Sequence, residues 1–390
     1  MKQYDYIIAG AGASGLSLVV HLIQSGRFSN AKILIVDKQP KTDNDRTWCF
    51  WDSSPGLFES IVSNTWNELE LFTDSGNTIR QSIFPYSYKM IRSADFYHYC
   101  FDLIGKSKNV DVLYGEITKV KSGPDFASII VDGNEYVARY VFNSIPYRQP
   151  QPAAGVYVLK QHFRGWFVSS ANDVFDERVP TLMDFRTDQH HGTSFYYVMP
   201  FSRREALVEY TIFSEELIPD EKYDQALVEY FENVLHLNTA DYKIESVENG
   251  VIPMTNYRFP ISDRNIINIG TAGGLTKAST GYTFRFIQKH CAVIIKRLIQ
   301  QQHPAVDMHS ARHRFYDSVL LNILASRRMD GASIFSRLFN TNPMQQVFKF
   351  LDNETSIAEE LRLISKLPTF VFSRAAISHG AKKIFKAVRP

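Results

Sequence analysis

The chain has few cysteines and no long apolar run, and both absences narrow the classes of protein to consider. Its three cysteines, Cys49, Cys100 and Cys291, lie far apart and form no Cys-x-x-Cys pair, so we expect neither disulfides nor a cysteine metal site. No apolar stretch reaches the ~18 residues of a membrane-spanning helix, and no basic segment precedes the first apolar strand. We therefore expect a protein that is neither secreted nor transmembrane, in a reducing cytoplasm.

The chain also lacks an excess of either charge. Its formal net charge is +2 over 390 residues, which gives no reason to expect nucleic-acid binding. His309 and His313 have helical spacing, but no Glu follows the first histidine and no carboxylate or cysteine completes a ligand set, so we expect no metal. A hydrophobic content of 44% is enough for a large core and two or three subdomains.

The strongest positive signal lies at the N-terminus, where the apolar run 4–9 leads directly into Gly10-Ala11-Gly12-Ala13-Ser14-Gly15. Gly10 allows a tight turn, Gly12 lets the backbone approach a pyrophosphate, and Gly15 permits close packing of a helix on the strand. The free N–H groups of that helix would hold the phosphates. The pattern predicts a dinucleotide-binding turn, and a glycine-rich turn without a ligand is the weaker alternative.

A second apolar strand, 32–36, supports this interpretation. It ends at Asp37, about 22 residues after Gly15, where a carboxylate would meet a ribose hydroxyl. The position of the fingerprint at the start of the chain favours FAD over NAD by analogy with other FAD enzymes. Arg46 and Arg92 are candidates for cofactor contacts because guanidinium groups pair with phosphate, although solvated surface arginines fit nearly as well.

A second glycine-rich segment follows the apolar run 266–269 and precedes a helical pattern that extends to Leu298. Its glycines are Gly270, Gly273, Gly274 and Gly281. Such a strand-to-helix passage supplies backbone N–H groups beside an anionic ring. Simple turn chemistry explains it equally well in isolation, and the N-terminal fingerprint favours the cofactor interpretation.

The order of elements predicts an α/β fold: a Rossmann-like FAD-binding domain with a β-rich substrate region and a helical C-terminus. We expect a split FAD-binding domain over 1–152 and 260–310, a substrate-binding sheet region over 153–259 and a membrane-facing helical region over 311–390. Four strands between 110 and 142 are expected to form a small antiparallel set. One helical pattern lies near 223–235.

Longer motifs point to a particular family. They are DRTWCFW at 45–51, PTLMDFRTDQ at 180–189, FYYVMPFSRREALVEYTIFS at 195–214, GTAGGLTKASTGYTF at 270–284 and ELRLISKLP at 360–368. With the N-terminal GAGASG, these segments resemble the bacterial lycopene β-cyclases along nearly the whole chain. Flavoprotein hydroxylases usually carry Gly-Asp where this chain has Gly270-Thr271, which argues against a monooxygenase.

The resemblance implies a redox-neutral ring closure of lycopene, through γ-carotene, and of other carotenoids with acyclic ψ-ends. It implies reduced FAD as the active form, with NAD(P)H as a transient reductant. Glu209 matches the essential acidic position of the family, and Asp184 is a further catalytic candidate with a structural hydrogen-bonding role as the alternative. Two rival functions are a flavin-dependent monooxygenase or reductase acting on an isoprenoid lipid and a non-catalytic carotenoid- or flavin-binding protein.

Strand periodicity describes the surroundings of Glu209. Within 206–213 it shares a face with Leu207, Thr211 and Phe213, and both faces are largely apolar. A carboxylate there is costly unless it is neutral or paired. An edge position facing water is favoured by the pattern alone, whereas the family match favours a buried acid.

The C-terminal region has features of a membrane-surface segment. Apolar residues between 334 and 351 have helical spacing, and residues 361–390 contain seven Lys and Arg but no Asp or Glu. This combination predicts peripheral binding to anionic lipid on the cytoplasmic side. Packing of these helices on the body of the protein, with a solvated basic tail, is the alternative.

Overall fold

The N-terminal apolar run forms a central strand of a parallel sheet in the computed structural model, which describes residues 2–146 and 150–388. Five strands make the parallel part: β1 (Lys2–Ala9), β2 (Ile33–Asp37), β8 (Val110–Tyr114), β11 (Asn134–Asn143) and β18 (Ile266–Asn268). Their order, β8-β2-β1-β11-β18, is that of a Rossmann-like sheet. The short β17 (Ser262–Asp263) pairs at the β18 edge.

The two faces of this parallel sheet have different covers. One face packs against three helices, α1 (Ala13–Gln24), α2 (Ser93–Gly105) and α4 (Phe284–Ile299). An antiparallel extension covers the other face and consists of β9 (Ile117–Ser122) and β10 (Ala127–Val131), joined to β11. The expectation of one antiparallel set over 110–142 is therefore wrong for β8, which pairs in parallel with β2, because its apolar pattern does not distinguish the two kinds of partner.

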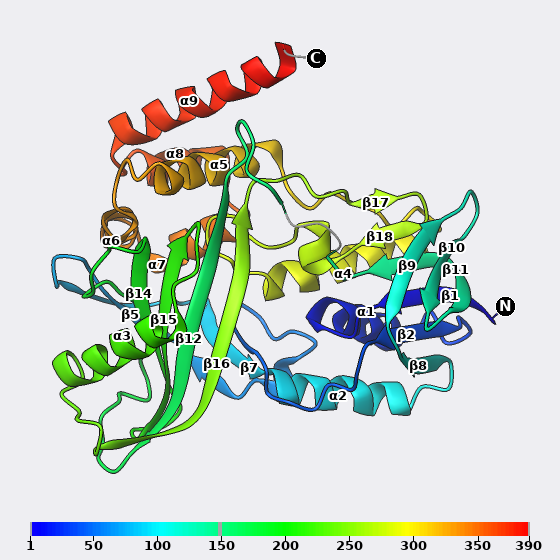
Figure 1. The fold of residues 1–390 in the computed structure, drawn as a ribbon, viewed down its shortest axis with the longest axis horizontal. Coiled ribbons are helices and arrows are strands. Elements are labelled where there is room, and N and C mark those ends of the chain that lie inside the picture. The colour runs from blue at the N-terminus through cyan, green and yellow to red at the C-terminus, as the bar shows by residue number, and fades with distance from the viewer. Residues whose placement is uncertain (1, 147–149, 389–390) are drawn as a thin grey trace.

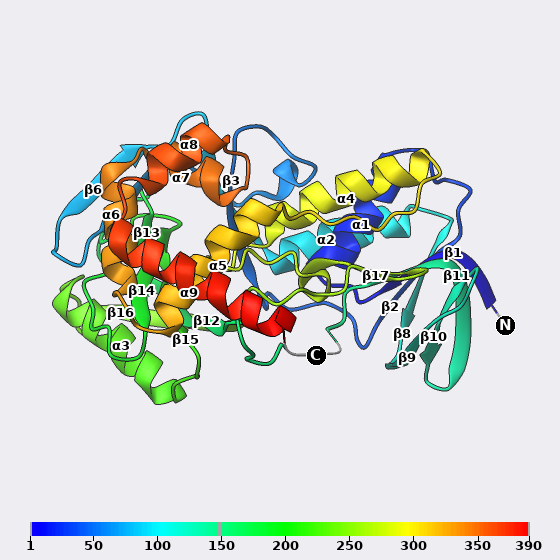
Figure 2. The same ribbon diagram turned by 90° about the horizontal axis from the view of Figure 1, so that it is seen from above.

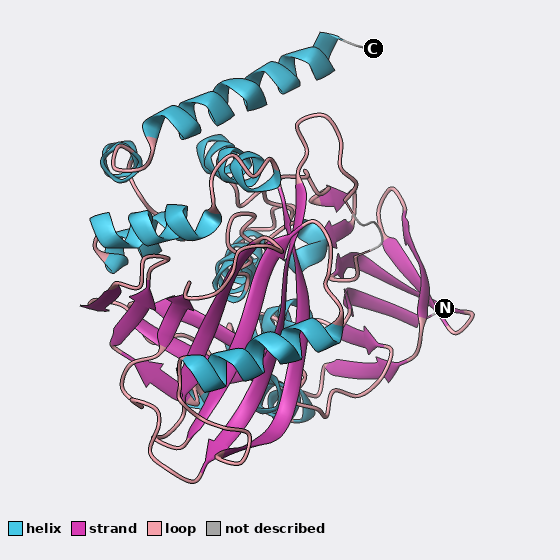
Figure 3. Cartoon of the chain, turned by 60° about the vertical axis from the view of Figure 1, so that its left-hand side comes forward, coloured by secondary structure: helices cyan, strands magenta, loops and turns pink. Residues whose placement is uncertain are grey.

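The second large sheet has seven strands, in the order β16-β12-β15-β14-β13-β5-β6. Its five strands from the middle of the chain are β12 (Val158–Ser170), β13 (Thr181–Asp184), β14 (Thr193–Pro200), β15 (Glu205–Ser214) and β16 (Tyr242–Thr255). The long strands β12, β15 and β16 run side by side (Figure 1). Helix α3 (Asp220–Asn233) crosses the outer face of this sheet (Figure 3).

Two strands of the second sheet come from the N-terminal part of the chain. β5 (Glu68–Phe72) pairs with β13, and β6 (Thr78–Ser82) completes the edge. The sequence division placed both strands in the nucleotide-binding part over 1–152, whereas hydrogen bonding places them with the β-rich region. A three-stranded sheet lies beside them and contains β3 (Thr47–Asp52), β4 (Asn64–Trp66) and β7 (Ser87–Arg92).

The C-terminal helices are α5 (Ala311–Ala325), α6 (Gly331–Thr341), α7 (Met344–Leu351), α8 (Ile357–Ile364) and α9 (Thr369–Val388). Of these helices, α6 and α5 contact the seven-stranded sheet at β14 and β16, and α9 packs on α5 (Figure 1 and Figure 2). The apolar positions of α6 and α7, between 334 and 351, are buried in the same core as the sheet, so their expected exposure to a membrane is wrong. Among the described residues, no helix is long and apolar enough to cross a bilayer.

Candidate active site

A cavity of about 480 Å³ lies where the two large sheets approach each other. Its wall combines the N-terminus of α1, strand β3, the segment 271–287 and residues of β12, β15 and β16. We call it the central cavity. Its volume is within the range of ligand sites, ~300–1,000 Å³, and its wall joins the glycine turns to the β-rich region.

The glycine turn before α1 has the geometry that a phosphate group requires. Gly10 has a φ of +102°, and a Cβ on Gly15 would lie 2.0 Å from the carbonyl oxygen of Gly10. In contrast, a Cβ on Gly12 would meet no atom within 4 Å and would stand at the cavity wall. Over the described ranges no side chain caps the N-terminus of α1, which leaves its first N–H groups free for an anion. The turn therefore fits the phosphates of a dinucleotide.

Asp37 lies at the end of β2, beside this turn. Its Oδ2 accepts a hydrogen bond from the N–H of Ala11 at 2.6 Å, and its Oδ1 lies 3.4 Å from Nζ of Lys41. Lys41 belongs to the cavity wall. The carboxylate thus fixes the turn on one side, and its contact with a ribose hydroxyl stays a prediction.

Two glycines of the second segment make close approaches around the cavity. A Cβ on Gly270, where φ is +60°, would lie 2.1 Å from Oγ of Ser14 at the start of α1. A Cβ on Gly281, where φ is +75°, would lie 2.1 Å from Oε1 of Gln161. Ser14, Gln161 and Gly281 all line the central cavity. Both glycine-rich segments are therefore next to one ligand space, as the sequence predicts.

Gly273 and Gly274 have a different setting. They end the short 3-10 helix η2 (Gly270–Gly273), and Gly274 has a φ of +74°. A Cβ on Gly273 would lie 2.4 Å from the carbonyl oxygen of Asn268. The wall of the central cavity contains neither glycine, so the structure supports a turn-forming role for both.

The two candidate arginines come from neighbouring stretches of backbone, since Arg92 is the cross-strand partner of Thr47, but their side chains lie in different places. Arg46 lines the central cavity, and its guanidinium donates to the carbonyl oxygen of Asn249 at 3.3 Å. Arg92 lies outside the cavity wall, with its guanidinium carbon 5.1 Å from the ring centre of Phe201. The structure therefore retains Arg46 as a candidate cofactor contact and does not bring Arg92 to the site.

Glu209 projects from β15 into the central cavity. Leu207 lines the cavity from the same face, whereas Ala206 and Val208 pack beneath α3 on the opposite face. Tyr197 on β14 is the direct cross-strand neighbour of Glu209 and lies at the cavity too. The edge position facing water, which the pattern alone favoured, is not the position found.

Burial raises the pKa of the Glu209 carboxyl to about 8. The negative charge of Glu248 raises this pKa further, whereas a hydrogen bond that the Thr211 hydroxyl donates to Oε1 at 2.6 Å lowers it. No Lys or Arg in the described part of the chain forms an ion pair with Glu209. A carboxyl with this pKa is largely protonated at neutral pH and has a proton to donate.

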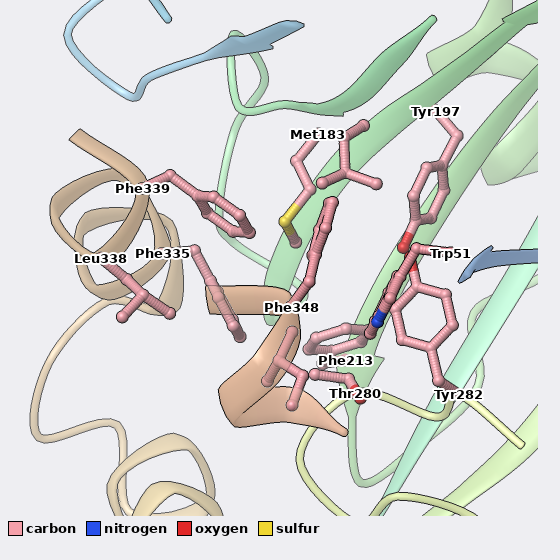
Figure 4. A pocket seen from close by; sticks show the side chains of 12 residues that line it. Trp51, Met183, Tyr197, Phe213, Thr280, Tyr282, Phe335, Leu338, Phe339 and Phe348 are labelled. Carbon is pink, nitrogen blue, oxygen red and sulfur yellow. The ribbon is translucent and has the colours of Figure 1, made fainter. Parts of the chain in front are cut away.

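Aromatic side chains surround the inner end of the cavity. The hydroxyl oxygens of Tyr88 and Tyr282 lie 3.3 Å apart, and the Trp51 ring meets the Tyr282 ring edge-on at 4.6 Å. Figure 4 shows Trp51, Tyr197 and Tyr282 grouped together. Burial raises the pKa of Tyr282 to about 12, so its phenol is neutral at physiological pH.

An apolar pocket adjoins the cavity on the side of α6 and α7. It shares Tyr197, Thr280 and Tyr282 with the central cavity and encloses about 20 Å³ of free space. Its remaining wall is hydrocarbon and aromatic, as Figure 4 shows for Met183 and Phe348. The polar and apolar spaces therefore meet at the two tyrosines.

Asp184, the second catalytic candidate, lies away from the cavity and the pocket. It is fully buried and accepts hydrogen bonds from the Arg186 guanidinium at 2.6 and 2.9 Å and from the Tyr230 hydroxyl at 2.9 Å. Neither the central cavity nor the apolar pocket has Asp184 in its wall. The structure thus favours the structural alternative for this residue, with α3 held to the sheet through Tyr230.

Glu248 on β16 is a cavity residue that the sequence reasoning missed. It is buried, and its carboxylate accepts hydrogen bonds from the N–H of Thr47 at 2.9 Å and from the Thr47 hydroxyl at 2.6 Å. Burial raises its pKa, and these bonds lower it. Strand alternation did not reveal the burial of Glu248. The apolar Val247 and Val251 lie on the opposite face of β16 from Glu248, and their face is the exposed one.

Metal binding has no support within the described ranges, where no group of three or more His, Cys, Asp or Glu side chains is arranged to hold an ion. Nε2 of His309 donates to the carbonyl oxygen of Gly274 at 2.8 Å, and Nε2 of His313 lies 3.1 Å from Oε1 of Glu360. The two histidines therefore have separate hydrogen-bond partners within the protein.

The family model for lycopene cyclase protein matches residues 5–377. The chain belongs to the lycopene cyclase family. It is 21% identical to the lycopene beta-cyclase of Pantoea ananas over 393 aligned residues, which cover 94% of this chain and 95% of that protein. The motifs that carry the resemblance in the sequence thus lie in a chain of the lycopene cyclase family.

Solved structures share the fold of this lycopene cyclase family member. A geranylgeranyl bacteriochlorophyll reductase-like protein from Thermoplasma acidophilum has a TM-score of 0.63 at 14% identity, with 97% of this chain and 100% of that chain covered. A flavoprotein/dehydrogenase from Cytophaga hutchinsonii has a TM-score of 0.58 at 12% identity, with both chains fully covered. At such identities the likeness shows a common fold and no common reaction.

Proposed function

We propose that the protein is an FAD-dependent lycopene β-cyclase in which Glu209 is the catalytic acid. The observation that supports this most strongly is a carboxyl group with a pKa of about 8 in the wall of a cavity that also contains the Gly12 turn. Protonation of an alkene needs an undissociated acid in a dry site. Family membership and the named activity of the Pantoea ananas relative supply the substrate class, lycopene and other ψ-end carotenoids.

The proposed reaction begins when the Glu209 carboxyl transfers its proton to the terminal double bond of a ψ-end. The neighbouring double bond supplies the electron pair that forms the ring carbon–carbon bond, and the positive charge moves to a ring carbon. Loss of a proton beside that carbon leaves the double bond of the β-ring. One proton enters and one leaves, so there is no net oxidation, and repetition at the second end converts γ-carotene to the bicyclic product.

The walls of the site suit a long hydrocarbon that carries a transient positive charge. The apolar pocket beside Tyr197 and Tyr282 offers a surface for the polyene, and aromatic faces attract a cation. Burial raises the pKa of the Tyr197 and Tyr282 phenols far above that of Glu209, so Glu209 is the strongest acid among these three groups. The enclosed volume of the apolar pocket is small, so entry of the polyene requires movement of side chains such as Phe335 or Phe348.

The residues that would hold the cofactor are the Gly12 turn, the N-terminus of α1, Arg46 and Gly281, which all line the central cavity. Bound FAD in its reduced, anionic form supplies negative charge beside a cation in a low-dielectric site. The fold shared with a flavoprotein supports this cofactor. NAD(P)H is proposed as a transient reductant because the sequence contains no separate NAD fingerprint.

The test of the function is cyclisation of lycopene by the purified protein with dithionite-reduced FAD in the absence of oxygen. We expect β-ringed products without matching oxidation of NAD(P)H. Gly12→Val should abolish FAD binding because its side chain would occupy the open space of the turn, whereas the control Gly56→Val, at an exposed glycine with open space around it, should retain FAD. Stoichiometric NAD(P)H consumption or a requirement for oxygen would instead support the monooxygenase or reductase acting on an isoprenoid lipid.

We propose peripheral attachment to a membrane surface, on the cytoplasmic side, through α8 and α9. Large apolar side chains are exposed there: Ile357, Leu361, Phe370 and Ile377. Exposed Arg362 and Arg374 lie among them, and basic residues near an apolar face attract anionic lipid. Four of the seven cations counted over 361–390, at positions 382, 383, 386 and 389, belong to side chains outside the described residues.

Vesicle flotation tests the attachment. Phosphatidylcholine vesicles with phosphatidylserine should carry the protein, and high salt should weaken the binding. The double variant Phe370→Ser/Ile377→Ser should float less, whereas Phe126→Ser, at an exposed apolar residue on the far hairpin, should float normally. If the amount of protein that floats changed neither with lipid charge nor with the α9 substitutions, the result would contradict the proposal.

A further inference from the structure

The central cavity contains two carboxyl groups on one face of the seven-stranded sheet. Glu209 on β15 and Glu248 on β16 are both direct cross-strand neighbours of Gly165 on the intervening β12. Direct neighbours in an antiparallel sheet project to the same side, and both carboxyls line the cavity. With strands ~4.8 Å apart, their backbones are about 10 Å apart.

Gly165 contributes no side chain of its own between the two acids, which lets the Leu207 side chain pack closely over it. A Cβ at this position would lie 2.9 Å from Cδ1 of Leu207 and 3.4 Å from Cβ of Glu209. The row Glu209–Gly165–Glu248 thus places two carboxyls on one face of the sheet, and the Leu207 side chain packs over the glycine between them. A substrate atom that approaches this part of the sheet can face both acids.

The two acids differ in their hydrogen-bond partners. Glu248 accepts from a backbone N–H and a hydroxyl of Thr47, next to the cation of Arg46. A backbone N–H can only donate, so it favours the ionised acceptor. Glu209 accepts from the Thr211 hydroxyl and has no such N–H among its hydrogen bonds in the described residues. Other titratable groups around the cavity are Lys41, Asp45, Cys49, Tyr88, Tyr97, Tyr197 and Tyr282.

We propose that Glu248 is the base of the reaction and accepts the proton that is released when the ring double bond forms. This inference rests on the proposed cyclase function. In this step the carbon–hydrogen bond beside the cationic ring carbon breaks, its electron pair becomes the ring double bond, and the proton passes to the Glu248 carboxylate. Transfer of a proton from Glu248 to the ionised Glu209, through water after the product leaves, restores both groups. Environments that separate the ionisation of two acids are the usual basis of such a division.

The first test compares Glu248→Gln with Glu245→Gln, a control on the same strand whose exposed carboxylate pairs with Lys243. We expect Glu248→Gln to keep FAD and its melting temperature while cyclisation falls by ~100-fold, the scale of a lost general base. Its residual product should contain rings with the double bond in another position, because the cation must lose a proton elsewhere. The control should give wild-type rate and product. A Glu248→Gln protein with wild-type rate and the same ring isomer would overturn the proposal.

Thr47→Val distinguishes a catalytic base at Glu248 from a residue that only holds the start of β3 in place. The variant removes the hydroxyl partner of Glu248 and retains the carboxylate and the backbone N–H. We expect a modest fall in rate with the β-ring retained. If Thr47→Val reproduced the altered ring isomer and the full loss of Glu248→Gln, Glu248 would be a positioning residue and the proposal would be wrong.

An infrared titration without substrate keeps this inference distinguishable from the cyclase function. In protein labelled with ¹³C-glutamate, the carbonyl band of a protonated carboxyl that disappears in Glu209→Gln reports Glu209. We expect this band to titrate at lower pH in Glu248→Gln, because a neighbouring negative charge has been removed. An unchanged midpoint would contradict the acid–base division even in an active cyclase. Failure of the wild-type protein to cyclise any ψ-end carotenoid would overturn the function while the titration still reports the pair.

Discussion

Glu209 and Asp184 are acidic residues of the same seven-stranded sheet, on opposite faces and in opposite surroundings. Asp184 lies beside Tyr196 and contacts α3 through Tyr230, whereas Glu209 lies beside Tyr197 and faces the central cavity. Asp184 is the more deeply buried of the two, yet its charge is compensated by Arg186 at 2.6 Å. Glu209 has a hydroxyl partner in place of a cation.

The difference shows that pairing, more than depth, decides what a buried carboxyl can do. An ion-paired carboxylate is stabilised in its charged form and holds elements together. An unpaired carboxyl in an apolar wall is stabilised in its protonated form and becomes an acid at neutral pH. The two residues therefore make a matched pair for mutational tests, with activity expected to respond at one and stability at the other.

The largest effect is expected for Glu209→Gln. The amide keeps the shape of the side chain but has no proton to give to an alkene, so cyclisation should fall by at least ~100-fold. FAD content and melting temperature should stay near those of the wild type. Chromatography of the pigments measures the loss, and Glu205→Gln, an exposed glutamate at the start of the same strand, is the control. Near wild-type cyclisation with full flavin occupancy would place the acid elsewhere.

Asp184→Asn should give the reverse result. Loss of the carboxylate weakens the Arg186 and Tyr230 hydrogen bonds, and hydrogen bonds to charged groups contribute ~1.5–3 kcal/mol each. We expect the free energy of unfolding to fall by about 2 kcal/mol in a denaturant titration, with normal activity per folded molecule. Asp176→Asn, whose ion pair with Arg178 is exposed, should change stability little. A stable Asp184→Asn protein that is inactive would return Asp184 to the catalytic candidates.

Local sequence patterns predicted the features that depend only on residues close together in the chain. The strand, turn and helix around Gly12 follow from glycine spacing, because backbone approach and helix packing each need a missing side chain. The facing of Glu209 and Leu207 follows from the two-residue period of a strand. Burial of Glu209 did not follow from that period, since both faces of β15 are apolar and a sequence does not say which face meets a cavity.

Features that depend on distant parts of the chain were not predictable in the same way. The apolar stripe on α6 and α7 looks the same whether it faces a bilayer or a sheet, and the structure buries it in the core. Arg46 precedes β3 and Arg92 ends β7, its neighbouring strand, and only the direction of each side chain decides that Arg46 alone lines the cavity. The Glu209–Gly165–Glu248 row needs the register of three strands, which long-range pairing sets.

The comparison also predicts a pH dependence of smaller size. Because the pKa of Glu209 is about 8, cyclisation should fall about tenfold per pH unit above that value as the acid loses its proton. Between its ordinary pKa of 4.5 and about 8, the folded protein retains a proton that the unfolded chain has released, so this residue makes the free energy of unfolding fall as pH rises. Glu209→Gln should remove that part of the dependence, and paired denaturation curves at pH 5 and 8, as approximate endpoints of this window, measure it. Identical pH slopes in the two proteins would contradict the raised pKa.

The smallest effect is expected for Thr211→Val. This variant sharpens the contrast between Glu209, which has a hydroxyl partner, and Asp184, which has a cation as its partner. The Thr211 hydroxyl donates to Oε1 of Glu209 at 2.6 Å and lowers its pKa. Valine has nearly the same shape as threonine, so the main effect of the substitution is on the pKa of Glu209. Loss of a hydrogen bond of ~1.4 kcal/mol should raise this pKa by up to about one unit. The descending limb of the pH–rate profile should then move to higher pH, while the rate at neutral pH stays close to wild type because the acid is already protonated there. A limb that moves to lower pH would show that the hydroxyl supports the protonated form of Glu209, and the assignment of Thr211 as a donor to its carboxylate would be wrong.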